Sequence, residues 1–246
     1  MDFSSIVAPY FKLTTSGTLL YTYNFPCGAG GAYPVGPLMQ AADGNFYGTT
    51  QMGGNLNYGT IYKMDQNGVV SIVCSLPAAG PYPQAGLVQA TDGNLYSGTW
   101  GTAGVASTLF QVTTSGTYTL LYTFTAKTGQ SVGAGLLQHT NGLLYGTTAN
   151  GGQYGYGTLF SLDMGLGPFV ALVRYRGKVG STVQILGQGF TGTTSVTFNG
   201  VPAINFTIGS DTFLTAVVPI GATTGPVVAT TPSGTLTSNR NFQIVH

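Results

Sequence analysis

The sequence contains no glutamate and has very little charge of either sign. Its 246 residues include 7 basic and 6 acidic side chains, so charged residues make up 5% of the chain. An average soluble domain has about 25%. Because Glu, Lys and Arg are strong helix formers, their scarcity argues against a helical protein. A net charge of +1 leaves no electrostatic footprint for nucleic acid or an anionic membrane, so neither is expected as a partner.

Long apolar runs and a leader segment are also lacking. No run approaches the roughly 18 apolar residues that a bilayer requires, so we expect no membrane insertion. The opening MDFSSIVAPYF carries an acid instead of a basic start and is interrupted by Pro9, which is unlike a secretory signal. The chain is therefore a mature form, a fragment or a protein exported by another route. Cys27 and Cys74 are too few for a disulfide framework.

What the sequence does contain favours a folded β-protein. Hydrophobic residues make up 43% of the chain and aromatic residues 12%, which is enough apolar surface to offset the entropy of ordering. Glycine occupies 39 positions, and threonine and tyrosine are frequent. This composition suits short strands joined by tight turns.

An internal repeat of 49 residues determines the expected fold. Three segments align, PLMQAADGNFYGTT, GLVQATDGNLYSGT and GLLQHTNGLLYGTT, and each is followed by a second shared stretch such as GTIYKMDQNG. Each full repeat predicts four short strands, with an Asp-Gly-Asn turn between the first two. This is the pattern of a propeller blade, and a solenoid is the alternative. The positions that recur every 49 residues include Asp43, Asp92 and Asn141, and Tyr47, Tyr96 and Tyr145.

The repeats resemble the GloVer-type tandem repeats of bacterial surface proteins and, more distantly, NHL-type propeller blades. The resemblance is carried by Asp43-Gly44-Asn45, by Tyr47-Gly48-Thr49 and by the loop motif Gly-Gly-x-x-x-Tyr-Gly-Thr at 53–60 and 151–158. The second repeat breaks this loop with GTAGVAST. The resemblance covers residues 9 to about 165 and implies a propeller-type architecture and a surface location, so residues 1–165 are the first expected domain. The expected blades span about 37–76, 86–124 and 135–163, with an N-terminal half blade at 9–25.

The period stops after residue 165, and residues 166–246 form a second expected domain. The stretch KVGSTVQILGQGFTGTTSVTFNGVPA resembles an IPT/TIG domain, which is an immunoglobulin-like β-sandwich. Val183, Ile185, Val196 and Phe198 alternate with polar residues, as strands with one buried face require. The predicted fold is therefore all-β: a partial or oligomer-completed β-propeller of about 3.5 four-stranded blades, followed by an immunoglobulin-like β-sandwich.

Few residues offer chemistry. Asp43 and Asp92 occupy equivalent turns, where Asp-Gly serves the hairpin, and His139 replaces an alanine of the other repeats and is expected on the surface. No ligand-like spacing for a metal and no nucleophile elbow is present. We expect no catalytic residues, no metal, no cofactor and no enzymatic activity.

A glycan site is the alternative, because sugars bind flat aromatic platforms. Trp100 is the single tryptophan, and Tyr58 and Tyr156 recur in two of the three loops. The expected ligand-binding residues are therefore Trp100, Tyr58 and Tyr156. The tyrosines of the repeated strands, Tyr47, Tyr96 and Tyr145, are expected in the core.

The incomplete repeats lead to the functional expectation. Ring closure takes about four to eight blades, so 3.5 blades leave apolar faces and strand edges uncovered. The chain is a piece of a longer protein, or two chains close one ring, or protomers join head to tail. We expect a structural or adhesive protein of the bacterial cell surface or an extracellular appendage that self-associates, and a secreted carbohydrate-binding module is the alternative.

Overall fold

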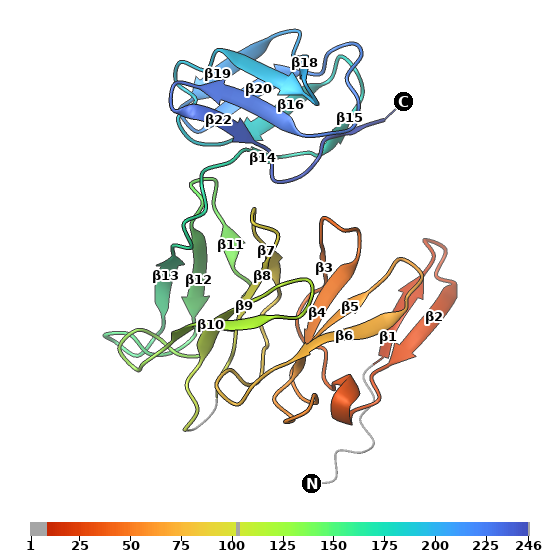
Figure 1. The fold of residues 1–246 in the computed structure, drawn as a ribbon, viewed down its shortest axis with the longest axis vertical. Helices are drawn as coiled ribbons and strands as arrows, with labels where there is room; N and C mark the ends of the chain where they lie inside the picture. Colours follow the sequence, from red (N-terminus) through yellow and green to blue (C-terminus); the bar gives the residue numbers. More distant parts are fainter. Residues whose placement is uncertain (1–8, 102–103, 246) are drawn as a thin grey trace. The chain divides into compact units, whose positions relative to one another are not determined.

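The computed structural model describes residues 9–101 and 104–245 (Figure 1). Their regular elements are β-strands, apart from one turn of 3-10 helix, η1 (Gly28–Gly30). The expectation of an all-β protein is confirmed. Residues 1–8, which make up most of the opening segment that is unlike a secretory signal, lie outside the described residues. Within the described ranges, no helix has the length and apolar character needed to cross a membrane.

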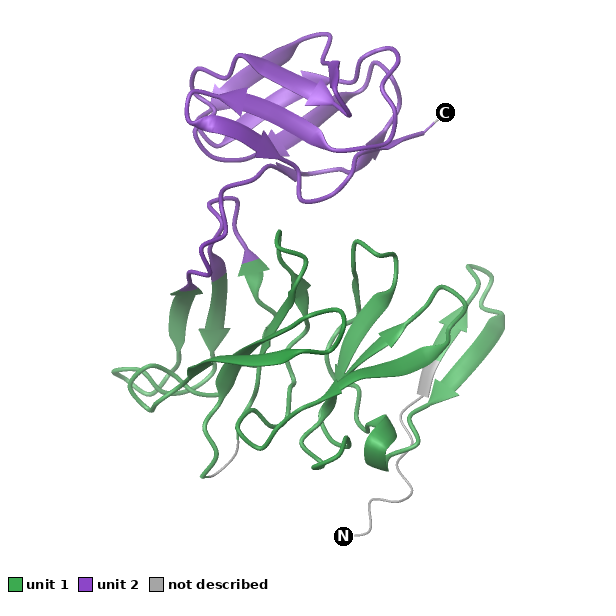
Figure 2. Cartoon of the chain, in the orientation of Figure 1, with its two compact units in different colours: residues 1–137, 145–161 green, residues 138–144, 162–246 purple. Residues whose placement is uncertain are grey.

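The chain forms two compact units (Figure 2). Unit 1 takes in the chain up to Leu137 and Tyr145–Ser161, and unit 2 takes in Gln138–Leu144 and the chain from Leu162 onward. The domain boundary after residue 165 stays a prediction.

Each 49-residue repeat forms its own small sheet, with strands in sequence order. The first sheet has the order β3-β4-β5-β6, the second β7-β8-β9-β10 and the third β11-β12-β13, and a two-stranded sheet β1-β2 precedes them. The turns between strands require glycine at a positive φ, as at Gly44 and Gly93. The strands are β1 (Pro9–Leu13), β2 (Leu19–Asn24), β3 (Met39–Gln40), β4 (Phe46–Thr50), β5 (Thr60–Met64), β6 (Val70–Ser75), β7 (Val88–Gln89), β8 (Leu95–Gly98), β9 (Thr108–Val112), β10 (Tyr118–Thr123), β11 (Leu137–Gln138), β12 (Leu144–Thr148) and β13 (Thr158–Leu162).

The first and second sheets pack face to face through one apolar cluster. Ile61 of β5 and Phe110 of β9 are both 0% exposed within it, and Leu76, Leu95 and Val112 complete its centre. The cluster explains why β5 and β9 carry apolar residues without clean alternation: strands covered on both faces bury successive side chains.

A pair of threonines joins the ends of the second and third strands in each of the three repeat sheets. The hydroxyls of Thr50 and Thr60 lie 2.7 Å apart, and the backbone N–H of Thr60 donates to Thr50 Oγ1 at 3.1 Å. The same arrangement recurs between Thr99 and Thr108 and between Thr148 and Thr158. The buried hydroxyls thereby satisfy one another and cap the opening of the loop.

Unit 2 contains two four-stranded antiparallel sheets that share one core. The sheets have the orders β14-β16-β20-β19 and β18-β17-β21-β22, and β15 and β23 form a parallel pair. As the alternation predicts, Val183, Ile185, Val196 and Phe198 are buried in this core. The strands are β14 (Ala171–Leu172), β15 (Arg176–Gly177), β16 (Thr182–Leu186), β17 (Ser195–Phe198), β18 (Val201–Pro202), β19 (Phe206–Ser210), β20 (Phe213–Val217), β21 (Val227–Thr231), β22 (Gly234–Thr237) and β23 (Gln243–Ile244).

Candidate functional site

The repeated aspartates hold their own hairpins. The carboxylate of Asp43 accepts hydrogen bonds from the backbone N–H of Asn45 at 3.0 Å, from the Asn45 amide at 2.9 Å and from the Tyr47 hydroxyl at 2.8 Å. Asp92 accepts the same three bonds from Asn94 and Tyr96. Three donors on one carboxylate leave it little capacity for a ligand, so these aspartates act in the turn.

The ionisation of this cluster follows from its contacts. Burial raises the pKa of Asp43, but the hydrogen bonds from Asn45 and Tyr47 outweigh it, and the pKa lies below its ordinary value. Burial and the neighbouring Asp43 carboxylate raise the pKa of Tyr47 to about 12. The cluster therefore consists of an ionised aspartate and a neutral tyrosine across the whole range near neutral pH.

His139 and the other titratable groups form no metal centre in the described ranges. His139 is exposed, as expected, and its Nδ1 accepts a hydrogen bond from the backbone N–H of Asn141 at 3.3 Å. Among the residues that the structure describes, no group of three or more His, Cys, Asp or Glu side chains could hold a metal ion.

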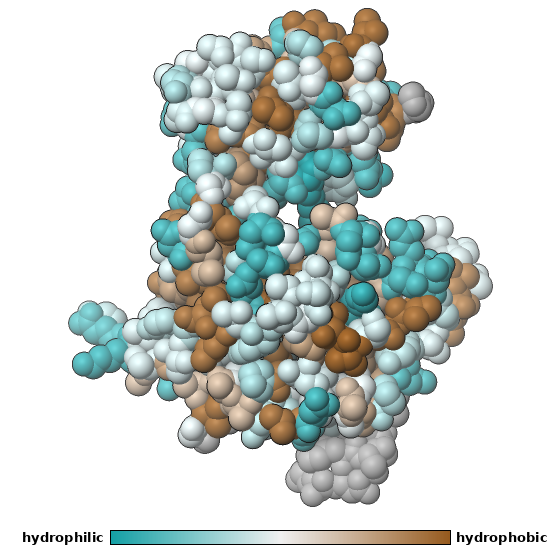
Figure 3. Space-filling model, in the orientation of Figure 1, coloured by the Kyte–Doolittle hydropathy of each residue, from teal (hydrophilic) through white to brown (hydrophobic). Residues whose placement is uncertain are grey.

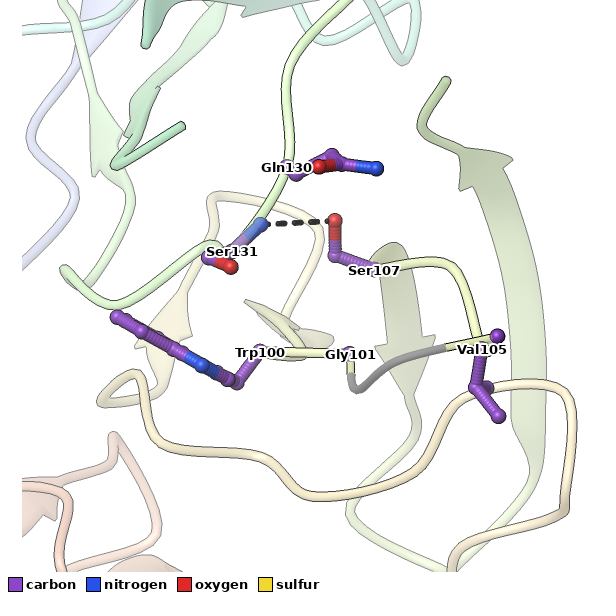
Figure 4. A pocket seen from close by; sticks show the side chains of 7 residues that line it. Trp100, Gly101, Val105, Ser107, Gln130 and Ser131 are labelled. Carbon is purple, nitrogen blue, oxygen red and sulfur yellow. Dashed lines mark hydrogen bonds between the residues drawn. The ribbon is translucent and has the colours of Figure 1, made fainter. Parts of the chain in front are cut away.

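Trp100 lines an open pocket of about 320 Å³ in unit 1 (Figure 4). Its indole packs against Gly133, where a Cβ would collide with the six-membered ring, and forms one wall. Across the pocket lie Val105 and Gln130, and the backbone N–H of Ser131 donates to Ser107 Oγ at 3.0 Å. The described lining residues are Trp100, Gly101, Gly104, Val105, Ser107, Gln130 and Ser131.

The pocket arises where the second repeat departs from the other two. Thr99 and Thr108 are 9 residues apart, whereas the equivalent pairs Thr50–Thr60 and Thr148–Thr158 are separated by 10. Counting back from the second threonine places Ala106 where the first repeat has Tyr58. The loop of the second repeat is therefore one residue shorter, and it carries an alanine where the first repeat carries a tyrosine.

Tyr58 shows what fills the equivalent position in the first repeat. It is half-buried against the apolar cluster, its ring lies 6.0 Å edge-on from that of Tyr82, and its carbonyl accepts the Tyr82 N–H at 2.9 Å. In the second repeat, Ser107 Oγ replaces that carbonyl as the acceptor, for Ser131. Tyr58 is thus a packing residue of the first repeat and does not line the Trp100 pocket.

Tyr156 occupies the third equivalent position and is 92% exposed. The three residues expected to form a glycan site therefore stand in three successive repeats, and Trp100 is the one that lines the pocket. The sequence interpretation passed over Ala106, Ser107 and Gln130. The signal for them is that the segment from Thr99 to Thr108 is one residue shorter than its equivalents in the other two repeats.

The two end sheets carry uncovered apolar side chains. Leu159 of β13 is 75% exposed, whereas the equivalent residues Ile61 and Leu109 are 0% and 2% exposed. In β1, Phe11 and Leu13 are about half exposed, whereas Phe110 and Val112, their equivalents in β9, are fully buried. Clusters of apolar side chains are visible on the drawn face of unit 1 (Figure 3).

These end residues belong to opposite faces of the repeat. Phe110 and Val112 face the preceding sheet, because they share a cluster with Ile61 of the first sheet. Ile61 faces the following sheet for the same reason. The β1-β2 sheet therefore exposes the face that packs backward, and the third sheet exposes the face that packs forward.

No protein-family model matches the chain, and a search of curated proteins finds no match. Among solved structures, the chain is similar to one described as a novel fungal alcohol oxidase with catalytic diversity among the AA5 family, in complex with copper. The identity is 14% and the TM-score 0.42 over 98% of this chain. The chain spans 60% of the length of that structure.

This comparison contradicts the expectation of a protein without enzymatic activity, because the similar structure is that of an oxidase. That expectation is withdrawn. At a TM-score of 0.42 and 14% identity, the likeness itself assigns neither an activity nor copper to this chain.

Proposed function

We propose that the chain is a self-associating structural or adhesive protein of the bacterial cell surface or an extracellular appendage. In this proposal, the repeat sheets are blades of a partial β-propeller of the GloVer type, and unit 2 is an immunoglobulin-like sandwich of the IPT/TIG type. The two sheets that share one core support the latter assignment.

One observation carries the proposal: the same strand position is buried in the two middle sheets and exposed at the end. Leu159 is 75% exposed, against 0% for Ile61 and 2% for Leu109. Burying a large apolar side chain stabilises by about 1.5–3 kcal/mol, so contact of this surface with another apolar surface is favourable.

A second copy of the chain is the occupant that this geometry fits. The first and second sheets already pack a forward face against a backward face. The third sheet exposes a forward face and the β1-β2 sheet exposes a backward face. The third sheet of one chain can therefore pack on the β1-β2 sheet of another. Such a contact is heterologous, and it closes into a ring or extends into a filament according to its rotation.

Light scattering over a concentration series tests the self-association. We expect the average mass of the wild type to rise across the micromolar range and Leu159→Lys to shift this rise to at least about tenfold higher concentration. Ile220→Lys is the matched control, because Ile220 is 83% exposed in unit 2 and lies outside both end sheets. A wild type that stays monomeric, or equal effects of the two substitutions, contradicts the proposal.

A glycan-binding module is the second candidate, and the Trp100 pocket is the observation that favours it. An indole wall beside Gln130 and two serines offers an apolar platform with polar groups at its rim. A glycan array compares the wild type with Trp100→Ala and with Gln130→Ala, since Gln130 is exposed and its loss spares the packing on Gly133. Binding that both substitutions reduce supports this candidate, and binding that neither changes excludes the pocket as the site.

A further inference from the structure

The positive charge of the chain is concentrated in one part of unit 2. Four of its 7 basic residues are Arg174, Arg176, Lys178 and Arg240, and all four are exposed. The first three fall within five residues around β15. Arg240 comes close through the parallel pairing of β15 with β23, in which Arg176 lies opposite Gln243.

Two of these cations share one aromatic ring. The guanidinium carbon of Arg176 lies 5.6 Å from the centre of the Tyr175 ring, and that of Arg240 lies 5.9 Å from it. The Tyr175 side chain is 40% exposed, so part of this aromatic side chain stays accessible beside the two charges. Both distances are within the range of cation–π attraction.

The backbone holds this arrangement in place. The carbonyl of Tyr175 accepts the N–H of Gln243 at 2.7 Å, and the carbonyl of Arg240 accepts the hydroxyl of Ser238 at 2.7 Å. Phe242, between these two anchored residues of the C-terminal segment, is 1% exposed in the core. The two guanidinium groups are therefore presented from a fixed backbone.

The two aspartates that the structure describes in unit 2 are engaged elsewhere. Asp211 accepts hydrogen bonds from the backbone N–H groups of Gly189 and Thr191, and Asp163 accepts that of Gly165. Two positive charges on one ring repel each other, and no carboxylate is described as their partner. An external anion would relieve this repulsion.

We propose that Arg176, Tyr175 and Arg240 form a binding site for an acidic polysaccharide of the uronate type. A guanidinium binds a carboxylate through two parallel hydrogen bonds, and three of the four cations are arginines. A uronate residue combines the carboxylate that the guanidinium selects with a C–H sugar face that packs on an aromatic ring. Four cations are fewer than the roughly 6–10 phosphate contacts that commonly anchor proteins on DNA. Basic clusters that bind lipid headgroups lie beside a membrane-spanning helix or on an amphipathic helix, whereas these four cations lie on and beside short strands.

Affinity electrophoresis with the full chain tests this site. Polygalacturonate in the gel is the probe, neutral dextran is the control polymer, and phosphatidylserine vesicles in a sedimentation assay test the membrane as the alternative. We expect polygalacturonate to retard the wild type, with a dissociation constant that rises with salt. The double variant R176Q/R240Q should bind at least about tenfold more weakly.

K127Q is the matched control, because it removes one exposed cation from unit 1. The control should bind like the wild type, and the conservative variant R176K/R240K should bind more weakly than the wild type because lysine lacks the guanidinium fork. The proposal is overturned if the wild type is not retarded, if K127Q weakens binding as much as R176Q/R240Q, if the lysine variant binds as tightly as the wild type, or if vesicles bind and polygalacturonate does not.

Discussion

Asp43 and Asp92 show at the residue scale how a scarce charge is used. Each carboxylate accepts three hydrogen bonds from two residues of its own hairpin, including the hydroxyl of a tyrosine that is 1% exposed. A buried hydroxyl without a partner is costly, so the aspartate also stabilises the tyrosine in the core. The Asp-Gly-Asn-x-Tyr motif is therefore one structural device that recurs along the chain.

Asp43→Ala tests this device. We expect the free energy of unfolding to fall by about 1–3 kcal/mol, because three donors lose their acceptor and the Tyr47 hydroxyl is left unpaired. Asp163→Ala removes an aspartate whose described contact is one backbone N–H, so it should cost less than about 1 kcal/mol. Urea denaturation of the two variants and the wild type gives both values, and equal losses would refute the role of the cluster.

The same cluster predicts a dependence of stability on alkaline pH. The pKa of Tyr47 is raised by burial to about 12 in the folded chain, from an ordinary value of 10.0. A group whose pKa is raised by folding stabilises the folded state fully below its unfolded pKa, and this contribution is lost as the pH rises toward the folded value. The wild type should therefore lose more stability between pH 10 and 12 than Tyr47→Phe does. Unfolding free energies from urea titrations at several pH values check this, and parallel decreases in the two proteins would be inconsistent with it.

At the scale of the element, each repeat is a sheet whose loops require close backbone approach. Gly59 has a φ of +102°, and a Cβ there would collide with the carbonyl oxygen of Thr50. Gly157 is in the equivalent position against Thr148, and the shortened second loop has Ser107 instead. Glycine therefore occupies this position in the two longer loops, of the first and third repeats, and serine occupies it in the shorter loop of the second repeat.

Gly59→Ala should destabilise the chain more than Gly93→Ala. Both glycines have positive φ, which costs an alanine about 1–2 kcal/mol, but the space around Gly93 is open. The added collision at Gly59 should bring its total to about 3 kcal/mol or more. Chemical denaturation measures both variants, and a Gly59→Ala protein as stable as Gly93→Ala would contradict the close approach.

The elements were largely predictable from the sequence, because their signals are local. The period of 49 residues located the strands, the Asp-Gly-Asn turns and the buried positions of Tyr47 and Tyr96, which are each 1% exposed. Tyr145 was expected in the core as well, but it is only partly buried. The Trp100 pocket was not predictable in the same way. It is lined by Trp100, Val105 and Ser107 of the shortened loop and by Gln130 and Ser131 of a later segment, and the sequence does not show that these two segments meet.

The Arg176–Tyr175–Arg240 cluster escaped the sequence for a different reason. Arg240 lies far from Arg176 in sequence and is brought to it by the pairing of β15 with β23. A bias of basic residues toward the C-terminal region was visible in the sequence, but the shared ring depends on strand register, which composition does not encode.

At the scale of the whole molecule, the account rests on two complementary faces. The low charge of the chain, 5% of residues, leaves little repulsion between copies. Within unit 1, a forward face and a backward face already pack together between the first and second sheets, and each end exposes one of them. Head-to-tail association would repeat an interface that the chain has already built.

Disulfide crosslinking between the two end faces tests this claim most directly. In a Cys27→Ser/Cys74→Ser background, one chain carries Leu13→Cys and the other Leu159→Cys, and the two are mixed under mild oxidation. The account predicts a crosslinked dimer from the mixture and far less from either variant alone, because a heterologous contact joins unlike faces. Crosslinking of each variant with itself, or none in the mixture at concentrations where the wild type associates, would contradict it.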